Sequence, residues 1–137
     1  MELPIKAMLD SNAFDLIAAA DVWPLLVPLV RQGYLQFLST PVQEAEIAAI
    51  SDARKRRQLQ AIPRLVCPVP DELDLDLGGA SDDLILSAAE KYADVLVTQD
   101  KVLTMRCAQR STCRVTDLDG LFRLLVQLKS QGGKDGA

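Results

Sequence analysis

Histidine does not occur in this chain of 137 residues, and its absence excludes several classes of catalytic site. Serine and cysteine hydrolases that use a histidine base cannot be built here, nor can metal sites that need an imidazole ligand. Any catalytic centre must therefore use carboxylates, amides, hydroxyls, thiols or cationic side chains.

Aromatic residues are also scarce, and acidic residues outnumber basic ones. Aromatic side chains make up 4% of the chain, and the formal net charge is -4. Domains that bind single strands by stacking bases display several aromatic rings on one surface, so the composition argues against such a platform. The net charge excludes binding of nucleic acid through an overall positive field, and only a local basic patch is compatible with it.

The chain has three cysteines, Cys67, Cys107 and Cys113, at spacings that match no metal knuckle. We interpret them as reduced thiols that pack like small apolar residues, with a disulfide or a redox role as the open alternative.

Long hydrophobic runs are absent too, because the apolar stretch around Trp23 is interrupted by Asp21, Pro24 and Arg31. The chain opens with the acid Glu2 and shows no secretory signal pattern. We therefore expect a cytoplasmic protein with no membrane partner.

What is present is an alternation of short apolar runs and amphipathic segments, without an internal repeat or a linker. Apolar residues make up 49% of the chain and charged residues 25%, which suits one domain with its own core. The pattern predicts a single three-layer α/β domain over residues 1–129, with a mostly parallel central sheet flanked by helices. The end of the chain, 130–137, is predicted to be a disordered tail.

The expected strands cover residues 5–9, 34–38, 95–98 and 113–116, and residues 73–77 are a candidate for a short edge strand. The expected helices begin near residue 13 and after Thr40, and cover residues 22–31, 53–65, 81–93, 101–107 and 118–129.

Two acids follow predicted buried strands at their carboxyl ends. Asp10 follows the strand over residues 5–9, and Asp100 lies just past the strand over 95–98. Open parallel α/β sheets bind ligands at this edge. Asn12 is predicted to cap the next helix, which places Asp10 where the partial positive charge of a helix N-terminus favours an anion. A role for Asp10 as a turn or capping acid alone stays open.

A third acid lies on the apolar face of the helix predicted to begin at Ser81. Asp82 shares that face with Ile85 and Leu86, whereas Asp83 falls in the solvated stripe. A carboxylate among apolar residues needs a cation or hydrogen-bond donors, so Asp82 is predicted to have a functional partner.

A fourth acid follows the capping-box pattern of Thr40, Pro41 and Gln43, which fixes the phase of the next helix. That phase predicts that Glu46 points inward with the small apolar residues, while Glu44 points to the opposite side.

The four acids are therefore predicted to meet in one pocket. Carboxylates gathered without histidine are best neutralised by hard divalent cations such as Mg²⁺ or Mn²⁺, whose preferred ligands are oxygens. Such a site can activate water for attack on a phosphodiester. A basic run of Arg54, Lys55, Arg56 and Arg57 is predicted to be either a solvated helix face or a set of phosphate contacts.

Four segments, MLDSNAFD, STPVQEAEI, SDDLILSAA and VLVTQD, resemble in order and separation the acidic motifs of PIN-domain nucleases, over about residues 5–125. The resemblance implies that the catalytic and metal-binding residues are Asp10, Glu46, Asp82 and Asp100, supported by Ser11, Asn12 and Thr98. Leu103 stands where many members carry a further acid, which favours one well-held metal ion over two.

The resemblance also implies divalent-metal-dependent hydrolysis of RNA that leaves 3′-hydroxyl and 5′-phosphate ends. Many small members are toxins of toxin-antitoxin pairs and form homodimers, so an antitoxin and a second copy are expected partners. Two alternatives stay open: a PIN-like module that binds RNA or protein without cutting, and a haloacid-dehalogenase-like phosphatase with Asp10 as nucleophile. The second alternative is weakened by Asn12, which stands where that phosphatase loop has its second acid.

Overall fold

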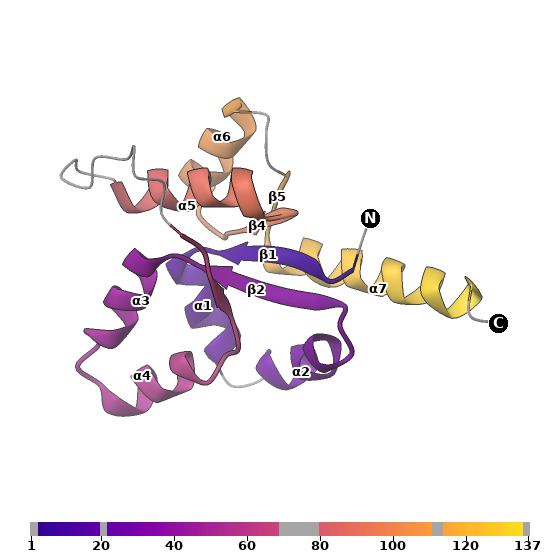
Figure 1. Cartoon of the computed structure of the whole chain (residues 1–137), viewed down its shortest axis with the longest axis horizontal. Helices are drawn as coiled ribbons and strands as arrows, with labels where there is room; N and C mark the ends of the chain where they lie inside the picture. Colours follow the sequence, from indigo (N-terminus) through magenta and orange to yellow (C-terminus); the bar gives the residue numbers. More distant parts are fainter. Residues whose placement is uncertain (1–2, 20–21, 69–79, 111–113, 136–137) are drawn as a thin grey trace.

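The computed structural model describes residues 3–19, 22–68, 80–110 and 114–135, in which five parallel strands form one sheet in the order β3-β2-β1-β4-β5 (Figure 1). The strands are β1 (Ile5–Leu9), β2 (Leu35–Ser39), β3 (Leu65–Val66), β4 (Val95–Val97) and β5 (Arg114–Thr116). The helices are α1 (Ser11–Ala18), α2 (Trp23–Arg31), α3 (Pro41–Ala48), α4 (Ala53–Gln60), α5 (Ala80–Tyr92), α6 (Lys101–Arg110) and α7 (Leu118–Asp135). Helices cover both faces of the sheet, which confirms the predicted three-layer α/β fold.

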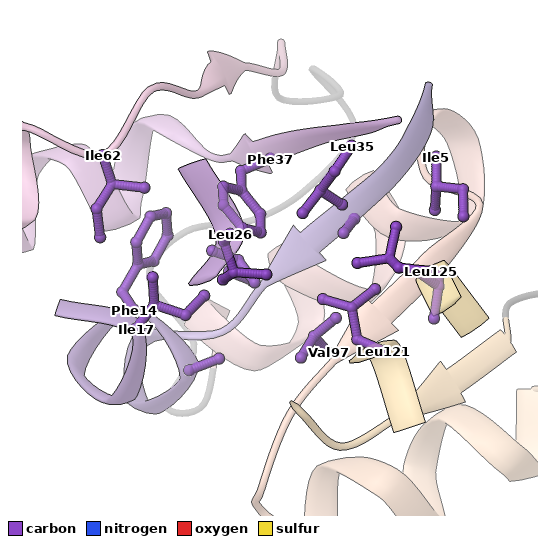
Figure 2. Packing of buried hydrophobic residues seen from close by; sticks show 14 of the residues in the cluster. Ile5, Phe14, Ile17, Leu26, Leu35, Phe37, Ile62, Val97, Leu121 and Leu125 are labelled. Atoms are coloured by element: carbon purple, nitrogen blue, oxygen red, sulfur yellow. The ribbon is translucent and has the colours of Figure 1, made fainter. Parts of the chain in front are cut away.

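Side-chain alternation along the strands divides the interior into two cores. In β1, Ile5, Ala7 and Leu9 face α1, α2 and α7, whereas Met8 faces α5 and α6. Figure 2 shows the first of these cores, where Phe14 of α1 and Phe37 of β2 lie among aliphatic side chains. Each fully buried large side chain contributes about 1.5–3 kcal/mol, so both faces of the sheet are held against their helices.

The position of β1 at the centre of the sheet decides where a site can form. β1 pairs with β2 on one side and with β4 on the other, both in parallel. The carboxyl ends of these three strands therefore meet at one edge, and the segments that follow them lie side by side. This edge carries the predicted functional residues Asp10, Thr98 and Asp100.

Several predicted boundaries need correction. Asp10, and not Asn12, is the N-cap of α1, because its side chain accepts a hydrogen bond from the amide of Ala13. The helix predicted over 53–65 ends at Gln60, because Pro63 cannot continue it, and residues 65–66 form β3 instead. The predicted edge strand within 73–77 lies outside the described residues.

The last helix is longer than predicted, because α7 continues past residue 129 to Asp135, where the sequence predicted a disordered tail. Gly132 and Gly133 each cost about 1 kcal/mol in a helix, but no proline stops the chain and each added residue gains a hydrogen bond. Within the described ranges no single helix is long and apolar enough to cross a membrane, and α1 and α2 pass that test only as a pair bent by 97°.

Candidate active site at the carboxyl edge of the sheet

The buried polar side chains gather at the carboxyl edge of the sheet. Among the residues whose burial is described, the buried polar or charged ones are Asp10, Ser39, Thr40, Gln43 and Thr98. Each of them ends or follows β1, β2 or β4. Polar groups are costly to bury unless they are hydrogen-bonded, so their concentration at one edge marks it as the polar centre of the fold.

Asp10 is held by donors from two different elements. The residue is 5% exposed, and Oδ1 accepts a hydrogen bond of 2.7 Å from the amide of Ala13 in α1. Oδ2 accepts a hydrogen bond of 2.5 Å from the Thr98 hydroxyl, which lies just past β4. Both donors fix the position of the carboxylate, next to the partial positive charge at the N-terminus of α1. Asp10 is therefore a capping acid that is also tied to the end of β4.

Thr98 connects the two strand-end acids. While its hydroxyl donates to Asp10, the same oxygen accepts a hydrogen bond of 3.0 Å from the amide of Asp100. Asp100 in turn accepts through Oδ1 from the amides of Val102, at 2.8 Å, and Leu103, at 3.4 Å, and so caps α6. Asp100 is half-buried, and its Oδ2 accepts no hydrogen bond from the described residues. Asp10, Thr98 and Asp100 form one connected group at the N-termini of α1 and α6.

The segment after β2 joins the same edge through Gln43. The predicted capping box is present, since the Thr40 hydroxyl accepts from the Gln43 amide and the Gln43 side chain accepts from the Thr40 amide. The side chain of Gln43 also donates through Nε2 to the carbonyl oxygen of Leu9, at 2.6 Å. Sequence reasoning identified the cap but missed this second contact, because a capping-box pattern gives no sign of a donor to another strand.

The predicted phase of α3 is wrong. The buried residues are Gln43 and Ile47, whereas Glu46 is exposed and Glu44 is half-buried. The prediction assumed that the small apolar residues face inward, but the buried amide of Gln43 turns the inward face by about one residue, or about 100°. Glu44 is a structural acid, because it accepts from the Ser39 hydroxyl, at 2.8 Å, and forms a two-point ion pair with Arg64.

Glu46 lies at a cavity next to this edge. The cavity has a volume of about 240 Å³ between α1, α3 and α4, and Phe14, Gln43 and Glu46 are among the residues that line it. Asp15 and Lys55 stand at the same cavity and form an ion pair at 3.6 Å. Glu46 therefore lines the same cavity as the buried Gln43, one turn further along α3.

The remaining predicted site residues are only partly described. Asp82 and Asp83 lie in the first turn of α5, and their side chains, like that of Ser11, are outside the described residues. Asn12 is exposed in the first turn of α1. Leu103 is 1% exposed and packs in the core formed with α5, so the position of the further family acid is filled by an apolar contact.

The residues at this edge fit a hard divalent cation by the chemistry of their donors, which are carboxylate and hydroxyl oxygens. Within the part of the chain that the structure describes, no three acidic or cysteine side chains lie close enough together to hold an ion. The structure therefore does not bring Asp10, Glu46 and Asp100 together as a three-acid site, and the prediction that Asp82 joins Asp10 and Asp100 lies outside the described side chains.

The basic run lies on α4. Lys55, Arg54 and Arg57 are exposed, and Arg57 donates to the carbonyl oxygen of Ala53 within the helix. Arg56 is half-buried and donates to the carbonyl oxygen of Ile50, at 2.7 Å, so part of its role is to hold the turn before α4.

The fold is similar to those of several solved structures. The PIN-domain endonuclease Utp24 superposes with a TM-score of 0.58 at 18% sequence identity, over 84% of this chain and 86% of the other. A chain of the VapBC2 complex from Rickettsia felis, bound to a DNA fragment from its promoter, superposes with a TM-score of 0.55 at 14% identity, over 82% and 98%. No protein-family model and no curated protein matches the sequence. The likeness in structure, joined to the parallel sheet with its polar carboxyl edge, shows that this chain has a PIN-like fold.

Proposed function

We propose that this chain is a divalent-metal-dependent endoribonuclease whose active site lies at the carboxyl edge of the sheet. The observation that carries the proposal is the connected group of Asp10, Thr98 and Asp100, which joins two acids across β1 and β4. Each carboxylate caps a helix N-terminus, and the Thr98 hydroxyl holds both the Asp10 carboxylate and the Asp100 backbone amide, so the two acids are pre-organised to bind a cation. The PIN-like fold supports a nuclease reading, since Utp24 is an endonuclease.

The proposed roles of the acids differ. Asp10, Asp100 and Asp82 are the proposed ligands and catalytic residues for Mg²⁺ or Mn²⁺, with Ser11, Asn12 and Thr98 in support. The exposed Glu46 of α3 is the fourth proposed catalytic acid, at the neighbouring cavity. When bound, the divalent cation supplies an activated water and neutralises charge on the departing oxygen of the phosphodiester. Thr98 keeps the Asp10 carboxylate in place through its hydrogen bond, so that the acid need not reorganise during the reaction.

RNA is the proposed substrate, with α4 as the surface that binds its backbone. The exposed side chains of Arg54, Lys55 and Arg57 lie on the helix that borders the cavity at Glu46. Local positive charge of this kind attracts phosphates even on a protein with net charge -4.

A role as the toxin of a toxin-antitoxin pair is the biological setting that we propose. The motif resemblance and the structural likeness to a chain of VapBC2 support it. In that setting the protein is cytoplasmic, acts as a homodimer and is held inactive by a cognate antitoxin.

The test is cleavage of an end-labelled RNA with Mn²⁺ or Mg²⁺, and with EDTA. We expect cuts that leave 5′-phosphate ends, loss of cleavage in EDTA, and loss in Asp10→Asn. The matched control is Asp94→Asn, because Asp94 is an exposed acid at the opposite edge of the sheet, where it accepts from the amide of Lys6. Asp94→Asn should cleave like the wild type.

Other outcomes decide between the alternatives. RNA that is bound but left uncut at every metal concentration would favour a PIN-like module without catalytic activity. Hydrolysis of a small phosphate ester without cleavage of RNA would favour the phosphatase.

A further inference from the structure

Gln43 performs two separate tasks with the two ends of its side-chain amide. The residue is 1% exposed, and Oε1 closes the capping box by accepting from the amide of Thr40, at 3.1 Å. Nε2 points to a different element and donates to the carbonyl oxygen of Leu9, at 2.6 Å. The first contact belongs to α3 alone, whereas the second joins α3 to the last residue of β1.

The contact with Leu9 lies directly beside the candidate site. Leu9 precedes Asp10 in the chain, and the Asp10 amide donates to the carbonyl oxygen of Val97 at the end of β4. The Leu9–Asp10 peptide group is therefore held at both of its polar atoms, with its carbonyl oxygen bound by Gln43 of α3 and its N–H bound by Val97 of β4. Glu46 follows Gln43 by three residues, so it lies one turn further along α3.

The choice of glutamine at this position is informative. Glutamate and glutamine both close a capping box with an N-cap threonine, so the cap alone does not require an amide. Only the amide can also donate to a carbonyl oxygen while it accepts from the Thr40 amide. The Gln43 side chain thus fits the additional task at Leu9, which a glutamate carboxylate cannot perform.

We propose that Gln43 is a positioning residue that sets the place of the Asp10 carboxylate relative to α3 and Glu46. The proposal rests on the proposed function, because it assigns Gln43 to the geometry of the same carboxylate site. Mutating a residue that supports a metal ligand typically lowers metal affinity or activity by about 10- to 100-fold. The proposed role of Gln43 includes no contact with the cation or the substrate.

The test uses two variants that separate the tasks. Gln43→Glu keeps an acceptor for the Thr40 amide but removes the donor to Leu9, whereas Thr40→Val removes the cap hydroxyl and leaves the donor in place. Mn²⁺ binding is measured by calorimetry, and kcat and KM by RNA cleavage under single-turnover and steady-state conditions. Hydrogen exchange of the Asp10 and Ala13 amides is measured without metal.

We expect Gln43→Glu to weaken Mn²⁺ binding and lower kcat by about 10-fold or more, with KM changed less than twofold. Its Asp10 amide should exchange faster than in the wild type. Thr40→Val should lower Tm through the lost cap but keep wild-type Mn²⁺ affinity, kcat and Asp10 exchange.

Equal losses in the two variants would overturn the proposal, because they would show that Gln43 acts only through the stability of α3. Unchanged metal binding, kcat and exchange in Gln43→Glu would overturn it as well. A wild type that neither binds Mn²⁺ nor cuts RNA would refute the proposed function, and the exchange rate of the Asp10 amide would still decide whether Gln43 positions this segment.

Discussion

The ion pair between Arg64 and Glu44 should be one of the larger single contributions to the stability of the fold. The Arg64 side chain is 8% exposed, its Nε lies 2.8 Å from Glu44 Oε2, and its Nη2 donates to Oε1 at 2.9 Å. Nη1 also donates to the carbonyl oxygens of Leu59 and Ile62, and the guanidinium lies 5.3 Å from the centre of the Phe14 ring. One side chain thus joins α1, α3 and the end of α4.

Removing the cation should cost about 2–3 kcal/mol. Breaking a fully buried ion pair by removing one partner costs about 3–5 kcal/mol, because the other charge stays buried. The Glu44 side chain is 30% exposed, so solvent relieves part of that cost. We expect Arg64→Met to lose about 2–3 kcal/mol, which for a domain of this size lowers Tm by about 6–12 °C.

Urea unfolding of Arg64→Met, Glu44→Gln and the double variant measures the coupling between the two side chains. Lys55→Met is the matched control, because Lys55 pairs with Asp15 at 3.6 Å while the two side chains are 51% and 47% exposed. That exposed pair should be worth less than about 1 kcal/mol. The reasoning is refuted if Arg64→Met loses no more stability than Lys55→Met, or if the double variant shows no coupling.

Three further predictions concern the site and the cores. Thr98→Val removes the hydroxyl donor to Asp10 and should weaken Mn²⁺ binding by about 10-fold in calorimetry, with the fold retained by circular dichroism. Replacing Arg54 and Arg57 together by alanine should weaken RNA binding and lower the slope of log Kd against log salt concentration by up to about 2. The single-turnover cleavage rate at saturating protein should stay near that of the wild type. An unchanged slope would show that the two side chains only form a solvated helix face. Burial raises the pKa of the Cys67 thiol, so the reactive thiolate is scarce at neutral pH. Cys67 should therefore react with a disulfide reagent only after the protein is unfolded in urea. Rapid labelling of Cys67 in the native protein would contradict its burial.

The strand-end acids could be placed from the sequence because their positions follow from local patterns. A run of apolar residues that ends on an acid defines both the strand and its carboxyl end. The sequence therefore predicts that Asp10 and Asp100 lie at the carboxyl edge of the sheet, where the structure has them. Thr98 was assigned to support through the resemblance, and the structure gives it a specific contact with Asp10.

The phase of α3 could not be read in the same way. The sequence shows Glu44 and Glu46 two residues apart, and hydrophobic periodicity alone favoured an inward Glu46. The partners that decide the phase, Leu9 for Gln43 and Arg64 for Glu44, are distant in sequence. A buried polar side chain satisfied by a distant partner leaves no periodic signal, so such contacts are found only in the folded chain.

The most direct test of the central claim is the position of Mn²⁺ in crystals of the protein, located by its anomalous scattering. We predict a peak at the carboxyl edge of the sheet, within about 2.5 Å of a carboxylate oxygen of Asp10, with Asp100 and Asp82 also at coordination distance. The same crystals of Asp10→Asn should show that peak reduced or lost. A wild-type crystal with Mn²⁺ bound elsewhere, or with no peak at this edge at millimolar Mn²⁺, would contradict the account.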